Sequence, residues 1–290
     1  MKNQQLRHIL LINLAMLCIS TSGALGRYIN LPPPLSIWYR GVFALFFLGL
    51  FCVWKKYRFS FEFKKHVFTI FLTGLLMGIH WVTYFYALRW SNVAIGMLSL
   101  FTYPIITTLL EPLFLKTKFQ TFHLFLCGMI LVGIYFLVPS FDLNNGMTQG
   151  LLMGLLSALS YAVRNLILKT KIGNFNGSML MFYQMVIISV LLFPVLFYYN
   201  NEYVLPQIPY LIFLGLVTTA IGHTLFLNSF KHFTVSTASI MSSMQPIFGI
   251  LLAVIFLHEL PNWRSLFGGM LILLIVVIES RRSLNMSSNN

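Results

Sequence analysis

Apolar residues run along this chain in ten stretches, each long enough to cross a lipid bilayer as a helix. Charged residues or clusters of Pro, Asn and Gly separate the stretches. Because the runs are apolar on every face, whereas the strands of a membrane barrel alternate, the pattern predicts helices. The expected spans are residues 9–26, 36–54, 67–88, 93–115, 122–138, 148–168, 178–199, 208–229, 235–257 and 263–280.

The composition supports a membrane protein. Of 290 residues, 58% are hydrophobic and 9% are charged, which excludes an ordinary soluble domain. The net charge of +13 is scattered between apolar runs, as membrane topology signals are, so no nucleic-acid partner is expected. The three cysteines, Cys18, Cys52 and Cys127, fall inside apolar runs without metal-motif spacing, and we expect no disulfide, metal or cofactor.

Ten crossings place both termini on one side of the membrane, and positive charge identifies that side. Of the 19 Lys and Arg residues, 14 fall on the side of the termini, which predicts cytoplasmic N- and C-termini in the cell membrane. Lys2 and Arg7 before an apolar run also fit a cleavable signal peptide, but we favour a first span because this segment has a counterpart later in the chain. The polar residues 283–290 are expected to form a disordered tail.

The chain repeats itself at a shift of 142 residues. This shift aligns Pro104-Ile105 with Pro246-Ile247, and each proline lies about eleven residues into its span, near mid-depth. Residues 1–143 and 144–282 then hold five crossings each. Because five is odd, the second repeat must be inverted relative to the first. Such a pair predicts a transporter that exposes one midplane site alternately to either side.

The chain resembles the EamA-type carriers of the drug/metabolite transporter superfamily over essentially its whole length, as two five-helix repeats. The residues that carry the resemblance are Arg40, Pro104, Ser236-Thr237-Ala238 through Pro246-Ile247, Leu257-His258-Glu259 and Gly268-Gly269. Glu259 matches an acid usual in the family, whereas the first repeat has Lys116-Thr117 there and its acid at Glu111. The resemblance implies an all-α carrier of a small metabolite, such as an amino acid, that acts without a cofactor.

The two prolines predict helix kinks that expose polar groups at mid-depth. Each removes one backbone hydrogen bond and frees the carbonyl four residues earlier. Ser99 and Tyr103 lie near Pro104, and Ser242 and Gln245 lie near Pro246. These side chains either pack helices together or line a cavity. We favour the cavity because the kinks recur at equivalent positions.

Aromatic and histidine side chains form a second candidate set. His80, Trp81 and Tyr84 share the third span, and His223 comes at nearly the equivalent place in the eighth. A histidine in hydrocarbon usually faces the bundle interior, where it forms an interhelical hydrogen bond, binds the solute or, as His80 could, carries a proton. Two histidines are too few for a metal site. Tyr161 in the sixth span either joins helices or contacts the solute.

Three charged residues lie within the spans away from their last residues at either end. Arg40, beside Tyr39, is expected inside the bundle, where its guanidinium would attract a carboxylate or phosphate on a solute. Arg164, near the cytoplasmic end of its span, is expected to snorkel to the interface, with solute binding as the alternative. For Glu111 a solvated or Lys116-paired carboxylate is favoured over proton coupling.

Together these features predict a secondary transporter that exports a small metabolite through a central site. Its partners would be the solute and the lipid bilayer, and a homodimer is left open. An intramembrane enzyme is the alternative from another class, but the chain has no HExxH motif and no pair of intramembrane aspartates. A channel would explain the helices without explaining the duplication. A nucleotide-binding loop is also absent from the sequence, which excludes ATP drive within this chain.

Overall fold

The computed structural model describes residues 2–57, 63–115, 122–137, 142–169, 176–233, 238, 241–242 and 244–288. Every regular element in this part of the chain is helical. In the first half the elements are α1 (Lys2–Tyr28), α2 (Pro33–Trp54), α3 (Phe63–Trp90), α4 (Val93–Leu100), α5 (Tyr103–Leu115) and α6 (Phe122–Leu137). In the second half they are α7 (Gly146–Lys169), α8 (Gly177–Leu191), α9 (Val195–Tyr198), η2 (Leu205–Gln207), α10 (Ile208–Phe213), η3 (Leu214–His223), α11 (Thr224–Ser229), α13 (Met244–Leu257) and α14 (Trp263–Ser288).

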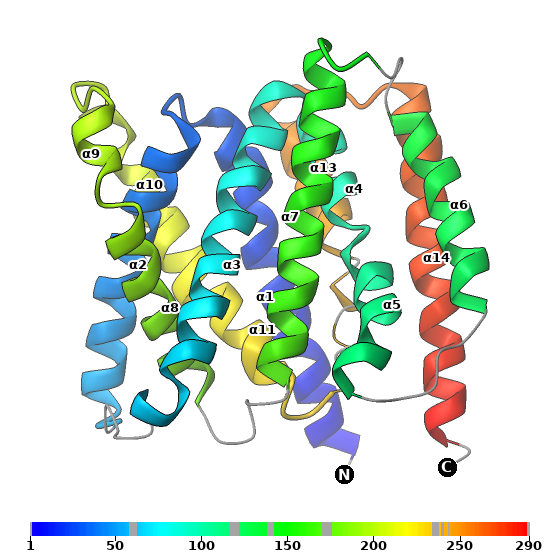
Figure 1. The fold of residues 1–290 in the computed structure, drawn as a ribbon, viewed down its shortest axis with the longest axis horizontal. Coiled ribbons are helices and arrows are strands. Elements are labelled where there is room, and N and C mark those ends of the chain that lie inside the picture. Colours follow the sequence, from blue (N-terminus) through cyan, green and yellow to red (C-terminus); the bar gives the residue numbers. More distant parts are fainter. Residues whose placement is uncertain are drawn as a thin grey trace.

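The helices form an upright bundle with one long axis in common. Seven helical stretches in the described residues are long and apolar enough to cross a membrane, and Met244–Leu257 and Trp263–Ile275 are shorter apolar helices. The first turn of α1 and the last turn of α14 lie at the same end, which we call the terminal end; the opposite end is the distal end (Figure 1). From the terminal end α1 runs to the distal end, and α7 runs the other way (Figure 1).

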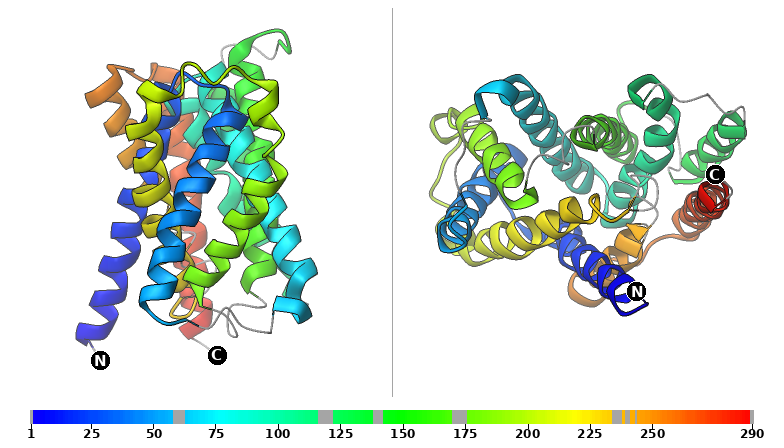
Figure 2. Two further views of the ribbon diagram at one scale, coloured as in Figure 1. Left: turned by 90° about the vertical axis from the view of Figure 1, so that its left-hand side faces the viewer. Right: turned by 90° about the horizontal axis from the view of Figure 1, so that it is seen from below.

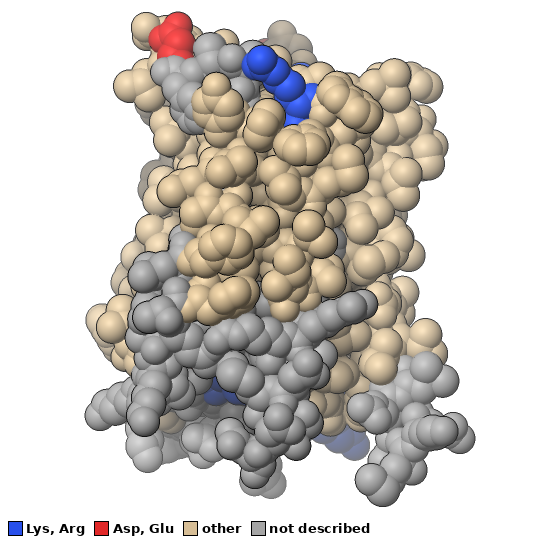
Figure 3. Space-filling view, turned by 90° about the vertical axis from the view of Figure 1, so that its right-hand side faces the viewer, with Lys and Arg blue, Asp and Glu red and all other residues tan. Residues whose placement is uncertain are grey.

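The bundle is apolar outside and polar at several points inside. Large apolar side chains are widely exposed, among them Phe68 (75%) and Leu113 (76%), whereas Arg40 and Arg164 have no exposed surface. Helices α6 and α14 pack side by side at one edge of the bundle (Figures 1 and 2). On the face that they form, the Lys, Arg, Asp and Glu residues drawn in blue and red lie near the two ends of the bundle (Figure 3). An apolar belt between polar ends is what a multi-pass membrane protein presents to lipid.

Both predicted kinks coincide with breaks in the helices. The chain leaves α4 at Leu100 and begins α5 at Tyr103, so Pro104 is the second residue of a new helix. Pro246 is likewise the third residue of α13, which follows a turn at Ser242. Proline is tolerated in the first turn of a helix because the N–H it lacks would have no partner there. The two halves therefore interrupt a helix at equivalent places.

A further interruption lies in the eighth predicted span. Residues Leu214–His223 form a π-helix between α10 and α11, and Thr219 Oγ1 donates to the Leu214 carbonyl five residues earlier at 3.0 Å. The π-helix has a wider turn than the α-helix and is frequently found at functional sites. The hydrophobic pattern of the sequence did not predict it.

The end of the chain differs from the prediction. We expected residues 283–290 to be a disordered tail, but α14 continues as helix to Ser288. The sequence has no Gly or Pro after Gly269 that would end the helix. Once a long helix has formed, each further residue adds one backbone hydrogen bond and loses the conformational freedom of only that residue. Ser236-Thr237, which matches the family pattern, and Lys116-Thr117, which departs from it, lie outside the described residues.

Candidate functional site

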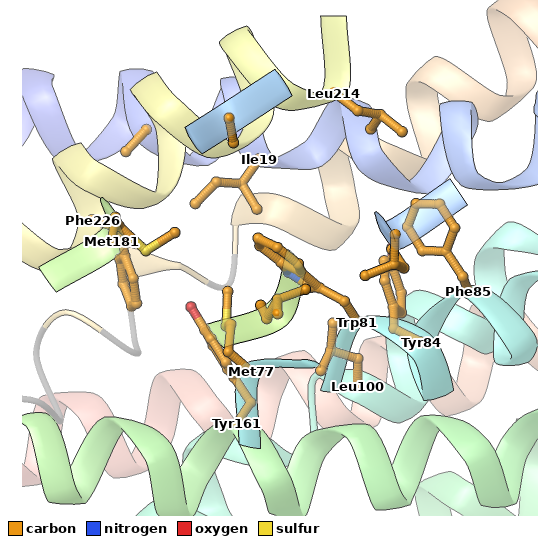
Figure 4. Close-up of a cluster of buried hydrophobic side chains, with 14 of the residues drawn as sticks. Ile19, Met77, Trp81, Tyr84, Phe85, Leu100, Tyr161, Met181, Leu214 and Phe226 are labelled. Atoms are coloured by element: carbon orange, nitrogen blue, oxygen red, sulfur yellow. The ribbon is translucent and has the colours of Figure 1, made fainter. Parts of the chain in front are cut away.

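A small enclosed cavity lies in the interior where the two halves meet. Its volume is about 10 Å³, which is room for about one water molecule. Side chains from both halves converge on this region, and Trp81 and Tyr161 point into it from α3 and α7 (Figure 4). The lining residues are Ile19, Ser22, His80, Trp81, Tyr84, Leu100, Tyr103, Tyr161, His223 and Gln245.

Stacked rings bring the two histidines of the two halves close together. The His80 ring stacks on Tyr161 with 4.4 Å between centroids, and Trp81 meets His223 edge to face at 5.4 Å. Tyr161 also lies 6.5 Å from His223. These rings form a continuous aromatic layer between α3, α7 and η3 that contains both His80 and His223.

Hydrogen bonds determine how His80 holds its proton when neutral. Its Nδ1 lies 2.7 Å from Ser157 Oγ and 3.3 Å from the Ser157 carbonyl, which is an acceptor only. Ser157 Oγ donates its one hydrogen to the His80 carbonyl at 2.9 Å. With Nδ1 as the donor all three contacts are satisfied, and the Nε2 lone pair is then available to accept a proton or a ligand hydrogen.

Arg40 lies inside the bundle beside this cavity. Its Nε donates to Thr219 Oγ1 of the π-helix at 2.8 Å, and its guanidinium carbon lies 3.8 Å above the Trp81 ring. Nη1 and Nη2 are buried and have no hydrogen-bond acceptor among the described residues. Burying a charge without a counter-charge is costly, so an anionic partner would stabilise this guanidinium.

Arg164 is also buried, and the expectation that it would snorkel to the interface is wrong. Its side chain has no exposed surface because polar groups of the interior hold it there. Nη1 donates to Asn165 Oδ1 at 2.9 Å, and Nη2 donates to Gln184 Oε1 at 2.6 Å. Its guanidinium carbon lies 5.8 Å from the Tyr161 ring centre, so it borders the same aromatic layer.

Not every candidate residue reaches the cavity. Ser99 is buried but donates to the Ile95 and Gly96 carbonyls of its own helix and packs against Gly154 of α7. Half-buried Tyr39 packs edge to face on Trp38, with ring centroids 4.9 Å apart. Both side chains belong to helix packing, because the direction of a side chain depends on helix rotation and not on depth alone.

Three of the remaining candidates, Tyr103, Ser242 and Gln245, lie at the helix breaks. The Tyr103 hydroxyl bonds Ser242 Oγ and thereby joins the two broken helices, and Gln245 lines the cavity. Glu111 lies on α5 immediately before Pro112, away from the cavity lining. The sequence prediction missed Thr219, which accepts from Arg40, and Gln184, which accepts from Arg164. The one available signal was that Gln184 is an amide within an apolar span, where it is costly without a partner.

A second polar cluster lies at the distal end. Arg27 Nε of α1 lies 2.7 Å from Glu259 Oε1, and Glu259 Oε2 accepts from the Val93 backbone N–H at 3.1 Å. His258, with a φ of 54°, turns the chain after α13 so that Glu259 reaches the first turn of α4. One carboxylate therefore joins α1, α4 and the end of α13.

A lipid-facing helical bundle with an enclosed polar site between two interrupted halves defines a multi-pass membrane transporter. The model of the EamA-like transporter family matches residues 6–138 and 148–280, and the chain belongs to this family, with one copy in each half. An uncharacterized transporter of Archaeoglobus fulgidus is 25% identical over 199 residues, which cover 69% of this chain and 71% of that protein. A solved crystal structure matches 97% of this chain and 98% of its own with a TM-score of 0.66 and 17% identity, which shows a similar fold.

Proposed function

We propose that this protein is a secondary carrier that exports a small metabolite with an anionic group, such as an amino acid, by alternating access to the central cavity. The observation that carries the proposal is the Arg40 guanidinium, which is buried over Trp81 with two nitrogens free of acceptors among the described residues. A carboxylate or phosphate would supply the missing acceptors in bidentate geometry. The stacked rings would then contact the apolar part of the solute.

The two family matches support alternating access. Their first helices, α1 and α7, run in opposite directions, as inverted repeats require (Figure 1). Each match also contains a helix break before a proline, next to the cavity. Two similar halves related in this way have two equivalent arrangements, one open to each end.

The orientation and direction complete the proposal. The excess of Lys and Arg on the side of the termini supports a cytoplasmic terminal end and ten crossings in the cell membrane. A solute leaving the cell would then enter from the terminal end and leave at the distal end. In this structure the Arg27–Glu259 contact joins helices at the distal end, and the cavity has room for about one water molecule, as expected for a carrier that is closed to the outside.

Counterflow in proteoliposomes tests the proposal. Vesicles containing the purified protein are preloaded with one of a panel of carboxylates and phosphates, and uptake of the same labelled compound is measured. Only a carrier exchanges solute one for one, whereas a channel equilibrates it. Arg40→Gln should lower exchange by at least about 30-fold, because a buried charge-assisted contact is lost.

Arg264→Gln is the matched control, since it removes an exposed arginine charge far from the cavity lining. Comparison of metabolites inside and outside cells with and without the protein identifies the panel compounds to try first and the direction of transport. Exchange that is the same in Arg40→Gln and wild-type protein would overturn the assigned role of Arg40.

A further inference from the structure

The cluster around Arg164 contains more hydrogen-bond donors than its acceptors can satisfy. Arg164 lies on α7, three residues beyond Tyr161, and Gln184 faces it from α8. Asn165 and Gln184 each use the side-chain oxygen to accept from the guanidinium. The NH₂ group of each amide therefore takes no part in these two bonds.

Three buried nitrogens of this cluster have no acceptor among the described residues: Arg164 Nε, Asn165 Nδ2 and Gln184 Nε2. The other near neighbour of the guanidinium is the Met181 sulfur, 3.5 Å from Nη2, which is a weak acceptor. Tyr161 lies next to the Asn165 amide, and its hydroxyl can serve either as donor or as acceptor. The cluster thus combines one positive charge with several N–H groups, and Arg164 has no ion pair with a carboxylate in the described part of the chain.

We infer that Arg164, Asn165 and Gln184 form a second anion-binding site, separate from the Arg40 site and on the terminal side of the aromatic layer. The ligand class is a small oxyanion, either the carboxylate of the transported solute or a free inorganic anion. An oxyanion accepts several N–H bonds at once, which is the capacity that the three unpartnered nitrogens require.

The placement of the two arginines gives the second site a function in transport. Arg40 is seven residues into α2 from its distal end, and Arg164 is five residues from the terminal end of α7, so each is about 8–10 Å along its helix from opposite ends of the bundle. Between them lie the rings of Trp81, Tyr161 and the two histidines. This step rests on the proposed function. Arg164 receives the anionic group of a solute that enters from the cytoplasm, and Arg40 receives the same group next.

Solid-state NMR of the protein in lipid bilayers detects the site directly. The arginines carry ¹⁵N, and acetate labelled with ¹³C at its carboxyl carbon is the probe, so dephasing of acetate by arginine nitrogen reports an anion beside a guanidinium. A second experiment uses inorganic phosphate and its ³¹P signal. Arg40→Lys and Arg164→Lys each remove one guanidinium while keeping the charge, and the double variant measures the background from surface arginines.

We expect each single variant to retain about half of the wild-type dephasing above background, because the two sites bind independently. A signal at Arg164 with acetate supports a site for the carboxylate of the solute, and a signal with phosphate alone supports a site for an inorganic anion. The second site is overturned if the Arg164→Lys variant shows the same dephasing as the wild type. It is also overturned if the Arg40→Lys variant shows only background dephasing. Loss in Arg164→Lys with none in Arg40→Lys would instead refute the role of Arg40 in the proposed function.

A further variant covers the case in which Arg164→Lys fails to fold. Gln184→Met keeps a side chain of similar length but removes the oxygen that holds Arg164 and one of the free NH₂ groups. It should weaken acetate binding at Arg164 by about tenfold while the Arg40 signal stays. Acetate affinity equal to that of the wild type in folded Gln184→Met protein would also overturn the inference.

Discussion

The contact between Arg27 and Glu259 should hold the distal end closed, and Glu259→Ala should release it. The carboxylate bridges α1 and the first turn of α4 from the end of α13, so these three helices cannot separate at the distal end while both bonds persist. Opening the distal end requires that at least one bond breaks. The substitution removes both bonds without placing a new group in the cavity.

The size of the effect follows from the two bonds. The ion pair spans 2.7 Å, but its side chains are 33% and 26% exposed, so solvent screening limits it to about 0.5–1 kcal/mol. The 3.1 Å bond from the Val93 N–H to a charged oxygen at a helix N-terminus contributes about 1–1.5 kcal/mol. A total of about 2 kcal/mol corresponds to a shift of about 30-fold toward the state open at the distal end.

Thiol labelling measures this shift. Ser22, which lines the cavity, is replaced by cysteine in a variant without the native cysteines, and a membrane-impermeant thiol reagent is added from outside cells. Glu259→Ala should raise the labelling rate by up to about 30-fold. Glu202→Ala removes another acid, exposed in a loop and bonded to Asn200, and should have no effect. A labelling rate within about twofold of the parent in Glu259→Ala, or an equal rise in Glu202→Ala, would refute the reasoning.

Three further predictions concern single residues. His80→Asn keeps an N–H donor for Ser157 on α7 but removes the group that can be protonated. If His80 carries the coupling proton, solute exchange in proteoliposomes should persist in this variant, but a pH gradient should no longer change the exchange rate. Gly154→Ala places a Cβ 2.7 Å from the Ser99 Cβ and should lower stability by about 1–3 kcal/mol in thermal melting, with recovery in the double variant that also carries Ser99→Gly. Burial and the adjacent His8 ring, whose centroid lies 3.7 Å away, lower the pKa of His232. Because the folded state then binds a proton less readily than the unfolded state, the free energy of unfolding should fall as the pH drops below about 6.5. His232→Gln should reduce the corresponding fall in melting temperature between pH 7.5 and 5.5.

Much of the architecture could be predicted without coordinates, because hydrocarbon imposes strict conditions on each segment separately. A helix satisfies its own backbone groups, so apolar length alone pointed to the seven helical stretches of the described residues that are long enough to cross a membrane. The prolines marked the helix breaks beside Tyr103 and Gln245. The same cost of polar groups in lipid identified His80 and Arg40 as interior residues.

The tertiary structure decided the partners of these residues. Arg27 meets Glu259 across 232 positions and Arg40 meets Thr219 across 179, and such pairings depend on how helices rotate and cross, which the pattern within one helix does not record. Arg164 shows the consequence most clearly. Its depth in the span favoured snorkelling to the interface, where water would solvate the guanidinium. The side chains of Asn165 and Gln184 instead accept hydrogen bonds from the guanidinium in the interior, so it is solvated without reaching the interface.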